Sequence, residues 1–137
     1  MEQNRIDEKI ANLKEIIAYI KKITTGDKKE ILMNRLIIDS LENNLRKAIQ
    51  IMIDLACDIA SKNKVGMCTT YYQTFEKLVE NGYLSNENLD TYKKMIGTRN
   101  RIVHDYDRVS NEILYIIATE RLNGFNLFIN DILKNSI

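Results

Sequence analysis

Proline and tryptophan are absent from this chain of 137 residues, and glycine occurs only five times. Without proline, no residue breaks a helix by removing a backbone donor, and with so little glycine, few positions favour tight turns. Isoleucine, leucine, lysine, glutamate and asparagine are abundant instead. This composition favours helices, and we find no segment with the alternating pattern expected of a strand.

Cysteine is also scarce. Cys57 and Cys68 lack the Cys-x-x-Cys spacing of metal and redox sites, so we expect free thiols, which suit a reducing cytoplasm. The charged amino terminus argues against a secretory signal, and no apolar stretch approaches the roughly 20 residues of a membrane span. The formal net charge is only +1, so any surface that attracts nucleic acid must be local. The sequence therefore predicts a cytoplasmic protein that does not bind membranes.

Apolar residues recur every three or four positions along most of the chain, which is the spacing of amphipathic helices. We predict a single domain over residues 1–137, folded as an all-α antiparallel bundle of about five helices. The expected helices cover 3–24, 27–63, 70–82, 85 to about 104, and 110–134. The second has a sustained apolar stripe that consists of Ile38, Leu41, Leu45, Ala48, Met52, Ala56 and Ile59. Its length of roughly 35 residues exceeds the usual range, which favours a kink or a partner.

Two helix starts have the spacing of a capping box. Asp27 precedes Glu30 by three residues, and Thr70 precedes Gln73 by three residues. The last helix is expected to begin at Ser110. Its inward face is predicted to consist of Ile113, Ile117, Phe125, Phe128 and Ile132.

The segment 97–107 holds the residue types that can bind a phosphate and move protons. His104 is the only histidine of the chain, with Arg99 five residues before it and Tyr106 two residues after it. Arginine offers a permanently charged planar fork that matches phosphate oxygens. Histidine can act as acid or base near neutral pH, and a phenol can form hydrogen bonds or be modified. The segment is therefore a candidate active site.

Helix geometry leaves the arrangement of these side chains open. Arg99 and His104 are separated by about 140° around a regular helix, whereas Asn100 and His104 share a face. Asn100 could orient the imidazole while Arg99 reaches around, or the helix could end near His104 and turn the ring. Alternatively, two copies could meet across a two-fold axis, so that Arg99 of one chain and His104 of the other face the same phosphate. Two histidines could then serve as acid and base.

Simpler explanations exist for the same residues. A histidine at a helix end is often structural, bonded to a carbonyl or to Asp107, and cations at that end suit the helix dipole. The window 93–108 holds five basic and two acidic residues, which is also common on solvated surfaces. One histidine and scattered carboxylates match no metal-ligand spacing, so we expect no metal and no other cofactor.

The segment resembles the Arg-x4-His-x-Tyr motif of HepT-like toxins, which are HEPN ribonucleases of HEPN/MNT toxin–antitoxin systems. Arg99, His104 and Tyr106 occupy the three motif positions. The likeness covers about 30–130 and includes stretches similar to the family's long second helix, its third helix and its signature, at 41–50 with 54–60, 72–82 and 96–106. The proline often found before the family's third helix is missing, since 66–69 reads Gly-Met-Cys-Thr. We expect this difference to alter loop stiffness and not chemistry.

The resemblance implies a homodimer of HEPN-like helical bundles whose signature segments line a cleft between protomers. It also implies metal-independent cleavage of RNA that leaves a 2′,3′-cyclic phosphate, with Arg99 and His104 as catalytic residues. Asn100 would support His104. Arg101 and Arg108 are candidates for holding flanking phosphates of the RNA substrate.

The family also implies a partner. An MNT-type nucleotidyltransferase antitoxin would transfer AMP from ATP to Tyr106 and so silence the toxin. Two other interpretations stay open at this point. The chain could be a non-catalytic helical partner or substrate-holding subunit of a nucleotidyltransferase, or a helical dimer in which His104 is only structural.

Overall fold

The computed structural model describes residues 2–104 and 109–135. Within these residues there are seven α-helices, one short 3-10 helix and no strand, so the all-α prediction is confirmed and the count of five is wrong. The elements are α1 (Glu2–Ile23), α2 (Lys28–Met33), α3 (Arg35–Lys62), α4 (Tyr71–Glu80), η1 (Asn86–Asn88), α5 (Leu89–His104), α6 (Asn111–Glu120) and α7 (Asn123–Asn135).

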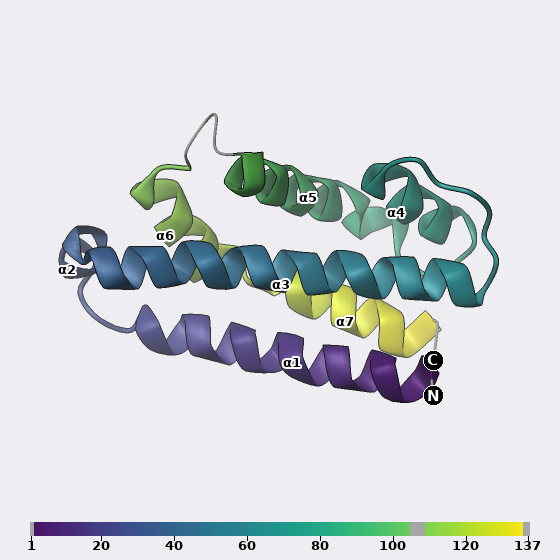
Figure 1. Ribbon diagram of the computed structural model, residues 1–137, viewed down its shortest axis with the longest axis horizontal. Coiled ribbons are helices and arrows are strands. Elements are labelled where there is room, and N and C mark those ends of the chain that lie inside the picture. Colours follow the sequence, from purple (N-terminus) through teal and green to yellow (C-terminus); the bar gives the residue numbers. More distant parts are fainter. Residues whose placement is uncertain (1, 105–108, 136–137) are drawn as a thin grey trace.

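The long helix α3 is the axis of the bundle and contacts α1, α2, α4, α5 and α6. Figure 1 shows α1 along one side of α3 and α5 along the opposite side, both antiparallel to it. The helix α7 passes behind α3 in this view and contacts α5. No helix in the described part of the chain combines the length and the apolar character needed to cross a membrane.

The core lies along α3. All seven residues of the predicted apolar stripe are buried there, and so are the apolar residues of α1 that face them. Three aromatic rings, Phe75, Tyr92 and Phe128, pack against one another with centroids 5.5 to 5.8 Å apart. These rings join α4, α5 and α7, and they place α5 firmly on the side of α3 that carries the candidate site.

The predicted second helix is broken at Asn34, where the backbone is extended with φ −96° and ψ 102°. Its side-chain oxygen accepts a hydrogen bond from the Ile37 N–H at 3.2 Å, so it caps the start of α3. Asparagine favours such caps over helix interiors because its side chain competes for backbone hydrogen bonds. Met33 and Leu36 beside the break are 79% and 83% exposed, so breaking the helix there sacrifices little apolar burial.

The predicted last helix is also two helices, since α6 ends before Arg121 and α7 begins at Asn123. The change of direction brings Gly124 against α5. A Cβ added at Gly124 would lie 2.7 Å from Met95 Sδ and 3.2 Å from Thr91 Cγ2. We attribute the break to this close contact, because the packing of α7 on α5 stabilises the fold more than the backbone hydrogen bonds of one continuous helix would.

The break changes which residues of α6 face the core. Ile113 was predicted to face inward but is 37% exposed, and Leu114 and Ala118 are buried instead. Ile117 is half-buried. The predictions for α7 are confirmed, because all three of its expected core residues are buried, namely Phe125, Phe128 and Ile132.

The capping signals are confirmed in their main part. Asp27 accepts a hydrogen bond from the Glu30 N–H at 3.3 Å, and Thr70 accepts one from the Gln73 N–H at 3.1 Å. The Gln73 side chain, however, reaches one residue further back than expected, and its Oε1 accepts the Thr69 N–H at 2.8 Å. This contact secures the first turn of α4, from which Tyr71 points toward the candidate site.

A buried carboxylate ties α7 to the start of α5. Asp131 accepts hydrogen bonds from the Ser85 N–H at 3.1 Å, the Ser85 Oγ at 2.6 Å, the Asn88 Nδ2 at 3.4 Å and the Tyr92 hydroxyl at 2.5 Å. Burial alone would raise the pKa of the Asp131 carboxyl, but these hydrogen bonds outweigh burial and hold its pKa below the usual value. Burial, together with the Asp131 contact, raises the pKa of the Tyr92 phenol. The helix that carries the candidate site is thus anchored at its start by a charged group.

Candidate active site

Arg99 and His104, two of the three motif residues, lie in the part of α5 nearest its last described residue. The structure describes this helix up to His104, so an end of the helix near His104 stays a prediction, and the direction of the His104 ring lies outside what the structure describes. Tyr106 and Arg108 also lie outside the described residues. Arg99, Asn100 and Arg101 are therefore the predicted site residues whose side chains are described.

Arg99 is half-buried and held from three sides. Its Nε donates a hydrogen bond to Gln50 Oε1 on α3 at 2.9 Å, and its Nη1 donates one to Asn100 Oδ1 at 3.2 Å. Its Cζ lies 5.6 Å from the centre of the Tyr71 ring at the start of α4, within the range of a cation–π contact. In the described part of the chain, Nη2 has no hydrogen-bond partner. The guanidinium is thus held through Nε and its face, while its outer nitrogens can still donate to an anion.

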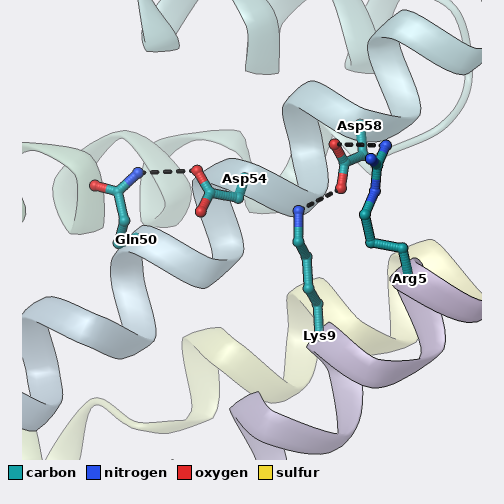
Figure 2. A network of polar contacts seen from close by, with 5 residues as sticks. All are labelled: Arg5, Lys9, Gln50, Asp54 and Asp58. Carbon is teal, nitrogen blue, oxygen red and sulfur yellow. Dashed lines mark hydrogen bonds and ion pairs between the residues drawn. The ribbon is translucent and has the colours of Figure 1, made fainter. Parts of the chain in front are cut away.

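The group that holds Arg99 is itself held. Gln50 Nε2 donates a hydrogen bond to Asp54 Oδ1 at 3.0 Å, one turn further along α3. Figure 2 shows the amide nitrogen of Gln50 turned toward Asp54 and its oxygen turned to the opposite side. The oxygen on that opposite side is the one that accepts from Arg99. A chain of hydrogen bonds therefore runs from Asp54 through Gln50 to Arg99.

Asp58 continues this polar row, and we call Gln50, Asp54 and Asp58 the polar stripe of α3. Asp58 is paired with Lys9 at 2.6 Å and with Arg5 at 3.5 Å, both on α1 (Figure 2). No ion pair involves Asp54 among the described residues, so its charge is the less compensated of the two. Burial, followed by the carboxylates of Asp54 and Asp58, raises the pKa of the nearby Cys57 thiol. The stripe is therefore a negative region beside a fixed arginine.

Asn100 contacts Arg99 through its side-chain oxygen. It stands one helical turn before His104 on the same face of α5, so its amide nitrogen can still serve the imidazole. Its predicted support of His104 stays a prediction. The observed contact adds a role that the sequence did not indicate, because Asn100 also fixes the outer edge of the Arg99 guanidinium.

Arg101 lies on a different flank of α5. It is exposed and lines a groove of about 490 Å³ between α5, α6 and α7, together with Lys94 and Arg121. The floor of the groove is apolar and includes Ile116 and Phe125. Since two positions correspond to about 200° around a helix, Arg101 and Arg99 point to nearly opposite sides. The structure thus does not bring these two arginines together, and the contact of Arg101 with RNA stays a prediction.

Sequence reasoning missed Gln50 and Tyr71 as neighbours of Arg99. Gln50 was noted only within a family-like stretch of helix, and Tyr71 was not named among the site residues. The spacing of Gln50 and Asp54, four residues apart on one helix face, was a visible signal of a polar pair. Nothing local indicates which residue that pair serves, because Arg99 is brought to it by the packing of α5 on α3.

The described side chains support phosphate chemistry more readily than metal chemistry. In the part of the chain that the structure describes, which leaves out the His104 ring, no three His, Cys, Asp or Glu side chains gather closely enough to hold a metal ion. The fixed guanidinium of Arg99 can donate to phosphate oxygens and stabilise negative charge that develops on phosphorus. A base or acid is still required, and His104 at the end of the same helix is the candidate.

The sequence profile of the family described as ribonuclease HepT-like matches residues 13–132. The mRNA nuclease HepT of Shewanella oneidensis is 30% identical over 129 residues, which cover 94% of this chain and 96% of that protein.

Solved structures agree with this match. The tri-AMPylated HEPN toxin of Shewanella oneidensis, in complex with its MNT antitoxin, superimposes with a TM-score of 0.85 at 30% identity, covering 93% of this chain and 96% of that chain. The cytosolic protein YutE of Bacillus subtilis superimposes with a TM-score of 0.81 at 15% identity, covering 96% of this chain and 87% of that chain. The second likeness shows a shared fold alone.

Proposed function

Because this chain belongs to the ribonuclease HepT-like family, we propose that it is a HEPN toxin that cleaves RNA in the cytoplasm without a metal ion. Its whole length, 1–137, would act as one domain. The observation that carries the proposal is the Arg99 guanidinium, which is fixed by Gln50, Asn100 and Tyr71 on the helix that also carries His104. A relative with 30% identity is an mRNA nuclease, and we extend ribonuclease activity to this chain.

The proposed reaction is an internal transesterification. The 2′-oxygen of a ribose attacks the adjacent phosphorus, the bond from phosphorus to the 5′-oxygen breaks, and a 2′,3′-cyclic phosphate remains. A histidine takes the 2′-hydroxyl proton, and a proton returned to the 5′-oxygen completes the leaving group. Arg99 neutralises the charge that builds on the phosphoryl oxygens. DNA lacks the 2′-hydroxyl, so it would not be cleaved.

A homodimer would supply a second histidine. One chain contains one imidazole, whereas the reaction requires both a base and an acid. Two copies related by a two-fold axis would bring two His104 side chains to one cleft. Arg101 and Arg108 of each protomer would then hold phosphates on either side of the scissile bond, and Asn100 would support the imidazole.

The proposed control of this activity is modification of Tyr106. A solved relative is an AMPylated HEPN toxin in complex with an MNT antitoxin. In this chain, the Tyr106 oxygen would form a phosphoester with the α-phosphate of ATP while pyrophosphate leaves. The added AMP would bring negative charge and bulk beside Arg99 and His104, and so repel and block RNA.

The test is an RNase assay of the wild-type protein and of His104→Ala, with EDTA present and with the 3′ ends of the products identified. Wild type should cleave and leave cyclic phosphate, whereas His104→Ala should lose activity by at least about 100-fold because general acid–base catalysis is removed. Lys14→Ala is the control, because Lys14 is exposed on α1, which lies on the opposite side of α3 from α5, and its loss should leave cleavage unchanged (Figure 1).

Equal cleavage by His104→Ala and wild type would refute the catalytic assignment. Failure of folded, unmodified wild type to cleave messenger or transfer RNA would instead favour a non-catalytic partner of a nucleotidyltransferase. The folded state of each variant is checked by circular dichroism, so that a loss of structure is not mistaken for a loss of chemistry.

A further inference from the structure

The side-chain amide of Gln50 connects a carboxylate to the candidate catalytic arginine. Its Nε2 donates to Asp54 Oδ1 at 3.0 Å, and its Oε1 accepts the Arg99 Nε–H at 2.9 Å. Gln50 and Asp54 stand one turn apart on α3, and Arg99 comes from α5, 49 positions away from Gln50 in the sequence. All three side chains are half-buried. The contact is therefore a tertiary one, made where two packed helices meet.

The carboxylate decides which end of the amide faces the arginine. An ionised carboxylate only accepts hydrogen bonds, so it selects the NH₂ end of Gln50. The oxygen of Gln50 is then left on the side of Arg99. If the amide turned over, its NH₂ group would face the Nε–H of Arg99 and its oxygen would face Asp54, so that donor would meet donor and acceptor would meet acceptor. Asp54 thus fixes Gln50, and Gln50 fixes the Nε of Arg99.

Holding Nε determines where the rest of the guanidinium points. With Nε bound on one side and the Tyr71 ring against its face, the planar group keeps little freedom to rotate. Nη2 has no hydrogen-bond partner among the described residues, and Asn100 takes only one donor of Nη1, so donors remain for a phosphate. When a catalytic arginine is already oriented before the substrate arrives, none of the substrate's binding energy is needed to order it.

We infer that Gln50 and Asp54 are positioning residues, which orient Arg99 so that its outer nitrogens meet the phosphate at which RNA is cut. The inference rests on the proposed function, since it assigns a purpose to an arginine whose catalytic role is itself proposed. Neither residue touches the substrate. Their effect is on kcat, because a misplaced Arg99 still attracts RNA but stabilises the transition state less well.

A matched pair elsewhere in the chain serves as the control. On α1, Gln3 Nε2 donates to Asp7 Oδ1 at 3.1 Å, which repeats the residue types, the four-residue spacing and the length of the Gln50–Asp54 bond. The oxygen of Gln3 accepts a long 3.5 Å contact from Lys62 and not from an arginine of the site. Gln3→Met and Asp7→Asn therefore remove an equivalent bond without touching Arg99.

The experiment measures kcat and KM for RNA cleavage in four site variants and in the two controls. Gln50→Met removes the acceptor, and Asp54→Asn lets the Gln50 amide turn over. Both should lower kcat by roughly 10- to 100-fold with KM changed much less. Gln50→Glu alone places two carboxylates side by side and should also impair cleavage. The fourth variant combines Gln50→Glu with Asp54→Asn.

The double variant tests the orientation directly. It keeps the net charge and the shape of the pair, and the introduced asparagine amide can donate to the introduced carboxylate, whose other oxygen still accepts from Arg99. Cleavage should return to within about threefold of wild type, which is the residual expected when a hydrogen-bonded unit is conserved. If the double variant is as poor as either single variant, or if Gln50→Met cleaves like wild type, the inference is wrong.

A second readout separates this inference from the proposed function. The Arg99 Nε–H signal in a nitrogen-15 NMR spectrum is assigned by its loss in Arg99→Lys. In Asp54→Asn this proton should exchange with water about tenfold faster, because Gln50 loses its hydrogen bond to the charged carboxylate and no longer holds its oxygen toward Arg99. It should be protected again in the double variant. If wild type cleaves no RNA, the proposed function fails, yet this signal still tests the orientation of Arg99. An unchanged exchange rate in Asp54→Asn would overturn the orientation of Arg99 by Asp54.

Discussion

Arg99 and Arg101 stand two residues apart on α5 and have opposite surroundings. Arg99 is half-buried against α3 and α4 and makes three contacts through Nε, Nη1 and its face. Arg101 is exposed, lines the groove between α5, α6 and α7, and has no ion pair among the described residues. One helix thus presents a fixed cation on one flank and a free cation on the other.

The difference separates two tasks of positive charge in a nuclease. A fixed guanidinium can stabilise charge that appears only in the transition state, because it does not have to reorganise. A free cation attracts phosphates along the whole backbone and contributes mainly to binding and to its salt dependence. Under the proposed function, Arg99 serves the chemistry and Arg101 serves the attraction of RNA.

Exchanging each arginine for lysine gives the largest expected effect. Arg99→Lys keeps the charge but loses the Nε donor and the planar fork, so cleavage should fall by roughly 100- to 1000-fold in kcat. Arg101→Lys keeps what a free cation needs and should stay within about twofold of wild type. Steady-state kinetics on one RNA substrate measures kcat for both variants. Equal decreases in kcat would show that the two arginines do not have different tasks.

Removing the Asp131 carboxylate, which anchors the start of α5, tests whether the difference between Arg99 and Arg101 depends only on their immediate surroundings. Asp131→Ala leaves the Tyr92 hydroxyl and the Ser85 N–H without their acceptor, so unfolding should become easier by about 2–4 kcal/mol at pH 7. Cleavage per folded molecule should be unchanged, because neither arginine touches Asp131. Denaturant unfolding measures the stability, and Asp39→Ala, an exposed carboxylate on α3, is the control.

The pH dependence of this effect has a definite sign. The pKa of Asp131 is lower in the folded protein than in the unfolded chain, where it is about 3.9. Its stabilising contribution is therefore complete above the unfolded value and is lost as the pH falls through the folded value. The difference in the free energy of unfolding between wild type and Asp131→Ala should be large at neutral pH and small in strong acid. A difference that grows in acid would contradict the conclusion that the ionised Asp131 carboxylate stabilises the fold.

The smallest effect is expected from Arg101→Ala. Binding of a catalytically inactive His104→Ala protein to RNA should weaken only a few-fold, and the slope of log affinity against log salt should fall by about 0.7, as for one phosphate contact to a single strand. Binding of labelled RNA at several salt concentrations measures both quantities. An unchanged slope would mean that Arg101 does not meet the RNA backbone.

Local rules predicted most helix boundaries, and tertiary contacts account for those they missed. Asp27 and Thr70 cap helices where their spacing indicated, and Ser110 caps a helix at the expected start, because a cap depends only on its next few residues. The break at Asn34 had a local signal, since asparagine favours helix caps, but the long apolar stripe led us to predict one helix over 27–63. The break before Asn123 depends on the contact of α7 with α5, which no local pattern reveals.

The candidate site divides in the same way. Arg99 and His104 were predicted as site residues because their residue types and spacing indicate a chemistry. Gln50 and Tyr71 were not found as site residues, since each reaches Arg99 only through the packing of α5 on α3 and α4. A short motif thus predicts the reacting groups, and the three-dimensional fold shows the side chains that hold Arg99.

The 49 positions between Gln50 and Arg99 have a consequence for the time at which the protein becomes active. During translation, α3 leaves the ribosome well before α5 does, and Arg99 cannot be oriented until α5 has docked. A nascent chain that ends before α5 therefore lacks the arranged site. If the proposed RNA cleavage is right, an unfinished chain could not cut the message that encodes it, because Arg99 becomes oriented only after α5 has been made.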